Sequence, residues 1–159
     1  MGRETKFRGK RLDNGEWQIG DLITFCDAQG NIHRCFIHLR MSPVGFTEPA
    51  LASTVCLYEV DPNTVGQFTG LIDKTKTEIY EGDIVSWHEI LHCTREFDGT
   101  QDLGTSIGVV EFRITKWSSG FNIKQIKGDN PFYDEMGTNF RFDELEIIGN
   151  IYENKELLK

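Results

Sequence analysis

Apolar and polar side chains alternate along much of the chain. In GVVEFRITKW (108–117), Val110, Phe112 and Ile114 fall on one face of an extended strand, and charged or polar residues fall on the other. Short runs of this kind, separated by glycine-containing turns, predict about nine or ten short strands and little helix. The pattern therefore indicates a mainly β protein.

Two turn signals predict an antiparallel meander in the first third of the chain. Asn14-Gly15 stands between two extended stretches, and it favours a hairpin because this dipeptide tolerates the positive φ of a type I′ turn. The tetrapeptide DAQG (27–30) predicts a second hairpin turn in the same way. We assign residues 1–59 to this N-terminal β-meander subdomain.

The remainder of the chain has the rhythm of an SH3-like barrel. GDIV (82–85) predicts a turn that enters a strand, with one of Ile84 and Val85 facing the core and the other facing outward. A Gly-Val-Val strand, a glycine-turned hairpin and a closing strand follow. We expect residues 60–159 to form this barrel, packed with the meander, and residues 88–107 to be a long insert between two of its strands.

The formal net charge of −8 makes the chain a poor non-specific nucleic-acid binder, because phosphate affinity comes mostly from lysine and arginine. The first twelve residues are nevertheless basic. This basic start has two readings, a strand edge protected by charge or a phosphate-binding patch, and we favour the first. Its cations are Arg3, Lys6, Arg8, Lys10 and Arg11.

Cysteine usage and hydropathy point to a soluble protein of a reducing cytoplasm. The four cysteines, Cys26, Cys35, Cys56 and Cys93, form no C-x-x-C pair and no disulfide framework, so we expect free thiols that behave as small buried apolar groups. The sequence shows neither a signal peptide nor an apolar run near the roughly 20 residues that a bilayer requires.

One short motif carries a possible chemistry. His88-Glu89-Ile90-Leu91-His92 matches the H-E-x-x-H pattern, in which a helix places two imidazoles on one Zn²⁺ and the glutamate acts on a bound water. Ser86 and Glu89 can act as a capping box for such a helix. A zinc-dependent hydrolase with His88 and His92 as ligands and Glu89 as base is therefore one alternative.

The context of the motif favours a strand instead. Strand propensity already runs through Ile84, Val85 and Trp87, and in a strand the two histidines would stand about 13 Å apart. No helical third ligand follows, since Glu111 lies in a clear strand pattern. We therefore expect no metal, and we expect CTREFDGTQDLGTS (93–106) to be a surface loop.

A second candidate ligand set is Cys26, His33, Cys35 and His38 on one predicted hairpin. His33 and Cys35 share a face of their strand, but His38 lies on the opposite face, so the four side chains do not predict a common metal site.

Four segments together resemble the YopX-like proteins of phages and prophages. They are KFRGKRLDNGEWQIGDLI (6–23), VDPNTVGQFTGLIDKTKTEIYEGDIV (60–85), GVVEF (108–112) and LEIIGNIYEN (145–154). The resemblance implies a small, β-rich, phage-borne protein without an assigned activity, so it supplies no catalytic residues. The chain departs from the family at Lys155, where proline is usual.

These observations favour a non-catalytic binding or assembly module in the cytoplasm of a bacterial host cell. We expect it to associate with itself and with a protein partner, and to use no cofactor and no membrane. The alternatives are the zinc-dependent hydrolase and a nucleic-acid-binding barrel.

Overall fold

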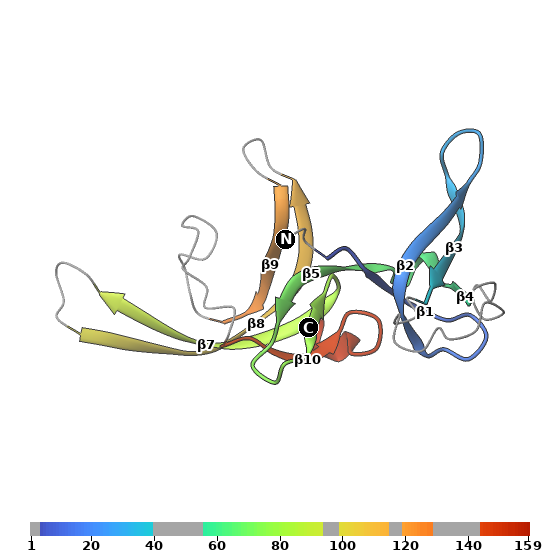
Figure 1. Ribbon diagram of the computed structural model, residues 1–159. Coiled ribbons are helices and arrows are strands. Elements are labelled where there is room, and N and C mark those ends of the chain that lie inside the picture. The colour runs from blue at the N-terminus through green and yellow to red at the C-terminus, as the bar shows by residue number, and fades with distance from the viewer. Residues whose placement is uncertain (1–3, 40–55, 94–98, 115–118, 129–143) are drawn as a thin grey trace. The chain divides into compact units, whose positions relative to one another are not determined.

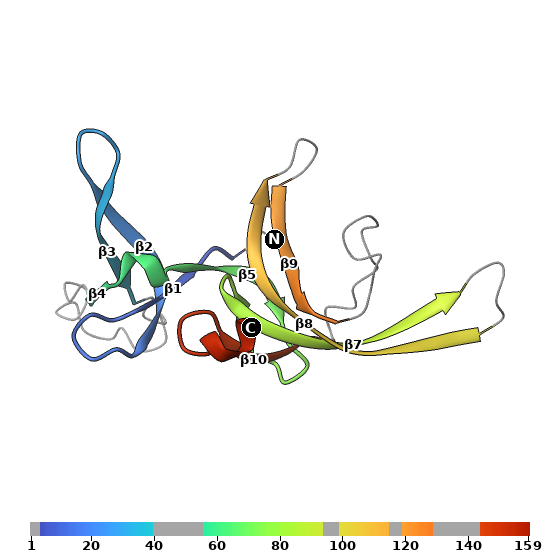
Figure 2. The same cartoon turned by 180° about the vertical axis from the view of Figure 1, so that it is seen from behind.

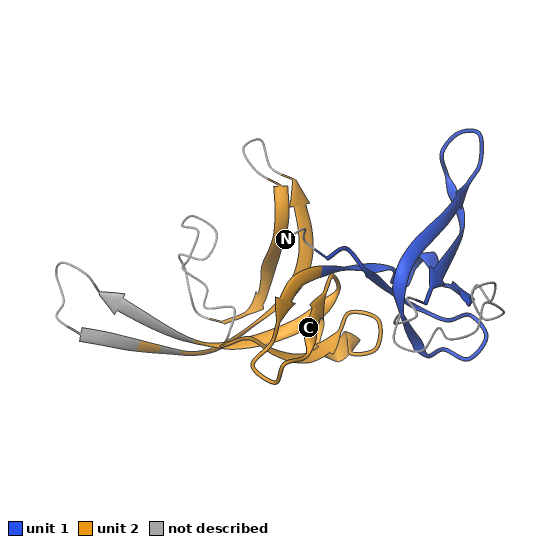
Figure 3. Cartoon of the chain, viewed as in Figure 1, with its two compact units in different colours: residues 1–68 blue, residues 69–159 orange. Residues whose placement is uncertain are grey.

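The computed structural model describes residues 4–39, 56–93, 99–114, 119–128 and 144–159, without the side chains of residues 89–93, 99–101 and 103. Most of these residues lie in strands, as predicted, and the helices among them are short 3-10 turns. The chain divides into two compact units, residues 1–68 and 69–159 (Figure 3).

Unit 1 is the predicted antiparallel meander, extended by one further strand. In this unit the strands are hydrogen-bonded in the order β4-β3-β2-β1-β5. A small core of Cys35, Ile37 and Val60 lies on one face of the sheet. The elements are β1 (Phe7–Lys10), β2 (Trp17–Cys26), β3 (Ile32–His38), β4 (Leu57–Val60), the 3-10 helix η2 (Pro62–Thr64) and the start of β5 (Gly66–Ile72).

The boundary between the units follows Phe68, whereas we placed the subdomain boundary after residue 59. Residues 60–68 belong with the first unit for two reasons. Val60 is fully buried in the unit 1 core. The first residues of β5 then pair with β1 at Arg8↔Gly66 and its neighbouring position.

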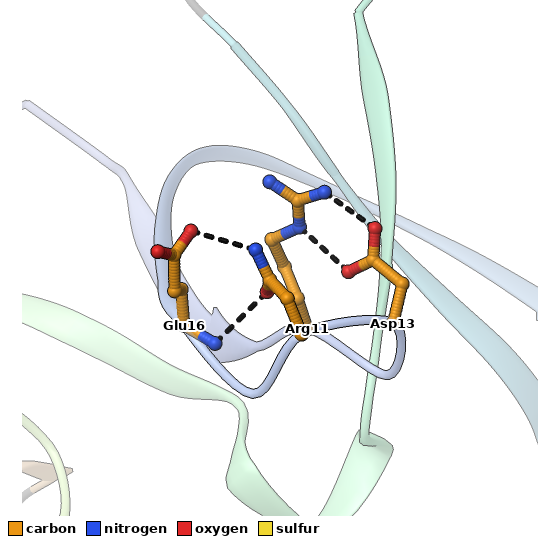
Figure 4. Close-up of polar contacts among 4 residues, drawn as sticks. Arg11, Asp13 and Glu16 are labelled. Atoms are coloured by element: carbon orange, nitrogen blue, oxygen red, sulfur yellow. Dashed lines mark hydrogen bonds and ion pairs between the residues drawn. The ribbon is translucent and has the colours of Figure 1, made fainter.

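The β1–β2 hairpin is confirmed, but its predicted type I′ turn is wrong. The loop is wider than two residues: the Arg11 N–H donates to the Glu16 carbonyl (2.9 Å), and the Gly15 N–H donates to the Arg11 carbonyl (3.0 Å). Gly15 has a φ of +74°, while Asn14 does not enter the positive-φ region. Side chains hold this wider loop, because Arg11 Nε donates to Asp13 (2.8 Å) and Asn14 Nδ2 donates to Glu16 (2.7 Å) (Figure 4).

The β2–β3 hairpin confirms the prediction from DAQG (27–30). Asp27 Oδ1 accepts hydrogen bonds from the N–H groups of Gln29 (2.9 Å) and Asn31 (2.8 Å). Gly30 takes a φ of +86°, which glycine adopts at little cost. The ladder then carries one extra residue in β3, at His33, between the pairs Cys26↔Ile32 and Phe25↔Arg34.

Unit 2 contains a four-stranded antiparallel sheet in the order β10-β7-β8-β9, and β6 pairs beside the end of β5. Its buried core consists of Ile79, Val85, Trp87, Val110, Ile123 and Leu145, of which Val85 and Trp87 belong to β7. The elements are β6 (Glu78–Tyr80), β7 (Asp83–Cys93), β8 (Gly99–Ile114), β9 (Ser119–Lys127), β10 (Glu146–Asn150) and the 3-10 helix η4 (Lys155–Leu158).

The predicted turn at Gly82-Asp83 is confirmed, but the predicted outward orientation of one of the two residues that follow is wrong. Gly82 has a φ of +84°, and the Asp83 carboxylate accepts a hydrogen bond from the Tyr80 N–H (2.8 Å). Ile84 and Val85 are both 0% exposed, although we expected one of them to face outward. Neighbouring residues of a strand point to opposite faces, so β7 is covered on both faces here.

The expected insert at 88–107 is mostly regular structure. The strand prediction for residues 88–93 is confirmed, while the surface-loop prediction for 93–106 is wrong for the part of it that is described, because β8 begins at Gly99 and pairs with β7. Residues 94–98 lie outside the described residues. Between the pairs Glu89↔Gly104 and Ile90↔Asp102, β8 has one residue more than β7, which makes a β-bulge. Gly104 adopts a φ of +80° at this bulge.

A buried carboxylate ties the β5–β6 turn of unit 2 to β10. Asp73 Oδ1 accepts hydrogen bonds from the N–H groups of Thr75 (2.8 Å) and Thr77 (2.9 Å), and its Oδ2 accepts one from the Ile147 N–H (3.3 Å). Burial alone would raise the pKa of Asp73, but the hydrogen bonds outweigh it and hold the pKa below its ordinary value. The carboxylate therefore stabilises the closure of this unit.

Replacing this carboxylate by an amide (Asp73→Asn) should lower the free energy of unfolding at neutral pH by about 1–3 kcal/mol, because buried backbone donors lose a charged acceptor. The lowered native pKa means that the contribution is complete above the unfolded pKa of about 3.9 and is lost as pH falls through the native value. Urea unfolding at neutral and acid pH measures this. Asp27→Asn, at the exposed β2–β3 turn, is the control, and an Asp73→Asn deficit that persists undiminished in strong acid contradicts the assignment.

The Gly82→Ala substitution should destabilise the protein by about 1–2 kcal/mol from backbone strain, with a further cost from crowding. A Cβ at Gly82 would lie 3.2 Å from Tyr152 Cε2, whereas a Cβ at Gly104, which also has a positive φ, meets nothing within 4 Å. Thermal unfolding of Gly82→Ala and Gly104→Ala separates the two effects. Equal losses in the two variants would show that the Tyr152 contact costs nothing.

Candidate functional site

The H-E-x-x-H segment lies in strand β7 rather than on a helix. His88 pairs with Thr105 and His92 pairs with Thr100 of β8, so the two histidines stand four residues apart along an extended chain. That spacing is about 13 Å in a strand, too far for two imidazoles to share one metal ion. The side chains of Glu89 and His92 lie outside the described residues.

His88 has a different partner from the one that the motif suggests. Its exposed ring places Nε2 3.2 Å from Asp102 Oδ1 on the neighbouring strand. Among the residues that the structure describes, no group of three or more histidine, cysteine or acidic side chains is placed to hold a metal ion.

His88 also lines an open groove of about 380 Å³ on unit 2. Ser86 stands beside it on the same face of β7, and Lys74 Nζ lies 2.6 Å from Glu146 Oε2 at the other side. Lys74 and Glu146 thus pair with each other, while His88 is engaged with Asp102. The full lining is Lys74, Ser86, Trp87, His88, Thr105, Glu144 and Glu146.

The cysteine and histidine residues of the β2–β3 hairpin do not converge. Cys35 is buried, and burial raises the pKa of its thiol, while Cys26 is exposed. His33 Nε2 lies 3.1 Å from Asp27 Oδ2, at the turn. His38 stands at the other end of β3. The structure therefore does not bring these four side chains together at one site.

The free-thiol prediction is confirmed for Cys26, Cys35 and Cys56, and the side chain of Cys93 lies outside the described residues. The expectation of burial is right for Cys35 and wrong for Cys26. Cys26 is exposed because it lies at the end of β2, beyond the part of the strand that the core covers.

The basic N-terminal side chains are engaged by nearby aromatic rings and acids. Lys6 Nζ lies 4.6 Å from the centre of the Phe68 ring, and the Arg8 guanidinium lies 4.9 Å from the Trp17 ring. Arg11 combines its ion pair to Asp13 with a position 4.0 Å over the Tyr58 ring. These contacts favour a structural role for the basic strand.

Sequence reasoning missed an exposed apolar feature of unit 1, on the hairpin that we call the β2–β3 arm and define as residues 21–36. β1 pairs only with Trp17–Gly20, so β2 beyond Gly20 pairs with β3 alone, and because β4 pairs with β3 only at Cys35–His38, the hairpin is two-stranded beyond Thr24 and Cys35 (Figures 1 and 2). The run Leu22-Ile23-Thr24-Phe25 is the signal in the sequence, because apolar side chains there fall on both faces of the strand.

One face of the arm forms an apolar ridge of Ile23, Phe25 and Phe36. Phe25 is 55% exposed, and its ring meets Phe36 edge-on with centroids 5.5 Å apart. The Arg34 guanidinium lies 4.8 Å from the Phe36 ring and makes two hydrogen bonds to the Glu59 carboxylate, at 2.7 and 2.8 Å. An aromatic ridge beside a fixed arginine has the composition of a protein-binding surface.

Unit 2 carries a second exposed apolar pair on the β8–β9 hairpin. Val110, Phe112 and Ile114 share a face as predicted, but only Val110 reaches the core, and Ile114 is 78% exposed. Phe112 contacts Phe121 edge-on, at 5.3 Å between centroids. Phe112 and Ile114 are therefore a suitable control site for substitutions in the ridge of unit 1.

No helix in the described part of the chain is long and apolar enough to cross a membrane. No curated protein matches the sequence. Among solved structures, the chain is similar to the crystal structure of protein EF1440 from Enterococcus faecalis, with 21% sequence identity over 99% of this chain and 100% of that chain and a TM-score of 0.48.

The family comparison covers nearly the whole sequence. The model of the family described as YopX protein matches residues 6–159, which includes both units and all the segments that carry the resemblance. The chain therefore belongs to the YopX protein family.

Proposed function

We propose that this YopX-family chain is a non-catalytic binding and assembly module of phage or prophage origin that acts in the cytoplasm of the host cell. The observation that carries the proposal is the apolar ridge of Ile23, Phe25 and Phe36, which lies on the face of the β2–β3 hairpin opposite to the unit 1 core. Exposed aromatic and aliphatic side chains gathered on one surface are typical of interaction sites.

The polar neighbours of the ridge also support binding. Arg34 is held by Glu59 and by the Phe36 ring, so it loses little side-chain freedom when a partner covers it. Arginine and aromatic residues are the types that contribute most to protein interfaces. An assembly role that includes self-association fits this surface.

The strand geometry of residues 88–92 supports binding over catalysis. The zinc hydrolase alternative needs two histidines on one helical face, and these histidines belong to β7. The nucleic-acid alternative rests on basic residues, and Lys6, Arg8 and Arg11 each contact an aromatic ring of unit 1. Neither alternative gains a specific observation.

Sedimentation velocity of the full chain tests the assembly role. We expect a species heavier than the 18.2 kDa monomer at micromolar concentration, and we expect it to dissociate on dilution. The apolar ridge is the physical reason, because its burial is favourable by about 25 cal/mol per Å². A chain that sediments as a monomer at every concentration would remove self-association from the proposal.

Metal analysis tests the rival activity. Protein purified without chelator should contain no stoichiometric zinc, because the two histidines lie four residues apart in an extended strand and are too distant to share a metal ion. His92→Ala should then leave both metal content and unfolding temperature near those of the wild type, with His38→Ala as a control outside the motif. Stoichiometric zinc that is lost in His92→Ala alone would favour the hydrolase.

A further inference from the structure

The β2–β3 arm has an open strand edge. On the β1 side, the last ladder pair is Phe7↔Gly20, and among the described strands none continues the ladder along Leu22–Cys26. The opposite edge of the same residues pairs with β3. The N–H and C=O groups on the open edge are therefore available to a further strand.

This edge lacks the protection that strand edges usually carry. Leu22–Cys26 (LITFC) is apolar or β-branched, and it contains no charge, proline or glycine. The bulge of the hairpin lies in β3 at His33, so it leaves β2 regular up to Phe25. A regular, uncharged edge of this composition is a template for strand addition.

We propose that the open edge of β2 pairs antiparallel with β2 of a second copy of the chain, across a two-fold axis at Thr24. Side chains alternate between the two faces of a strand. A two-fold axis perpendicular to the sheet therefore keeps equivalent side chains of the two copies on the same face only when it passes through a residue and not between two residues. With the axis at Thr24, Ile23 of each copy stands opposite Phe25 of the other copy. Leu22 likewise stands opposite Cys26 of the second copy.

The side-chain pairs at the centre of this register are favourable ones. A β-branched residue opposite an aromatic residue stabilises an antiparallel pair, and threonine pairs well with threonine. The Ile23–Phe25 contacts also join the ridges of the two copies into one continuous apolar surface, because Phe25 already contacts Phe36.

Self-complementary side chains select a second copy as the occupant, because Ile23, Thr24 and Phe25 supply both members of each central pair. Charge acts against this pairing, since each chain carries a net charge of −8 and the register sets Asp21 opposite Asp27 of the second copy, so the uncharged residues Leu22–Cys26 must outweigh it. A charged peptide strand would find no opposite charge along these residues. The inference rests on the proposed assembly function and gives that function a location.

Charge reversal across the axis tests both the edge and the register. In Ile23→Lys/Phe25→Lys the introduced lysines face each other on both sides of the axis, and in Ile23→Glu/Phe25→Glu the introduced glutamates do. We expect each variant alone to associate on the order of 100-fold more weakly than the wild type. An equimolar mixture should form a one-to-one heterodimer, because opposite charges then face each other.

The matched control is Phe112→Lys/Ile114→Lys, which charges the exposed apolar pair of unit 2 and should leave association unchanged. Circular dichroism and thermal unfolding verify the fold of each variant. Sedimentation of the single variants and of their mixture is the measurement.

The outcomes distinguish a failure of strand pairing at β2 from a failure of the assembly function. A wild-type oligomer that both charged variants retain would overturn pairing at β2 and leave the assembly role standing. Monomeric variants that form no heterodimer on mixing would overturn the register at Thr24. A wild type that is monomeric at all concentrations would overturn both proposals.

A cysteine at the axis gives a second readout that does not depend on charge. Thr24 also pairs with Cys35 of its own hairpin, so the background is Cys26→Ser/Cys35→Ala. In this background, Thr24→Cys places the thiols of two copies opposite each other at a Cα separation that suits a disulfide. Mild oxidation should link this variant into dimers, while Gln29→Cys, at the exposed turn of the same arm, should stay unlinked. Equal linking of the two variants would point to random collision and contradict the axis.

Discussion

A strand must have both its faces and both its edges covered or solvated, and the cores of this protein are too small to cover the longest strands. The buried core of unit 1 centres on Cys35, Ile37 and Val60, yet β2 runs from Trp17 to Cys26. Beyond Gly20 the strand leaves β1, and its side chains from Ile23 onward are exposed. The arm, the ridge and the open edge all follow from this mismatch between strand length and core size.

In unit 2, buried hydrogen bonds to carboxylates cover backbone groups at the ends of strands. The hydrogen bonds of Asp73 join the β5–β6 turn to β10, and the Asp83 carboxylate closes the turn before β7. These carboxylates satisfy backbone N–H groups that would otherwise be buried without an acceptor. Where such contacts end, toward the tip of the β8–β9 hairpin, apolar side chains such as Ile114 reach solvent.

Local signals predicted the elements of the fold well. The turn at DAQG (27–30) and the Gly82-Asp83 turn were predictable because their conformations depend on residues within the turn itself. The β1–β2 loop was not, because its form depends on Arg11 and on Tyr58, which is distant in the sequence. Likewise, the strand pairing of residues 99–106 depends on β7, which continues the ladder through a segment of weak strand propensity.

The candidate site was less predictable than the fold. A four-residue spacing of histidines has chemical meaning only on a helix, and the choice of strand was visible in Ile84, Val85 and Trp87. The apolar run at Leu22–Phe25 was equally visible, but its exposure depends on where β1 stops, which no local pattern reports. A surface that lies beyond a core can be identified only when the core has been located.

Backbone hydrogen exchange along β2 tests the central claim, that the open edge is covered by another strand when copies meet. In an isolated hairpin, only the amides of Leu22–Cys26 that point toward β3 are protected, and those on the open edge exchange freely. The account predicts that both sets exchange slowly at high protein concentration and that the edge set becomes fast on dilution. Fast exchange of the edge amides at every concentration, in a chain that nevertheless associates, would contradict it.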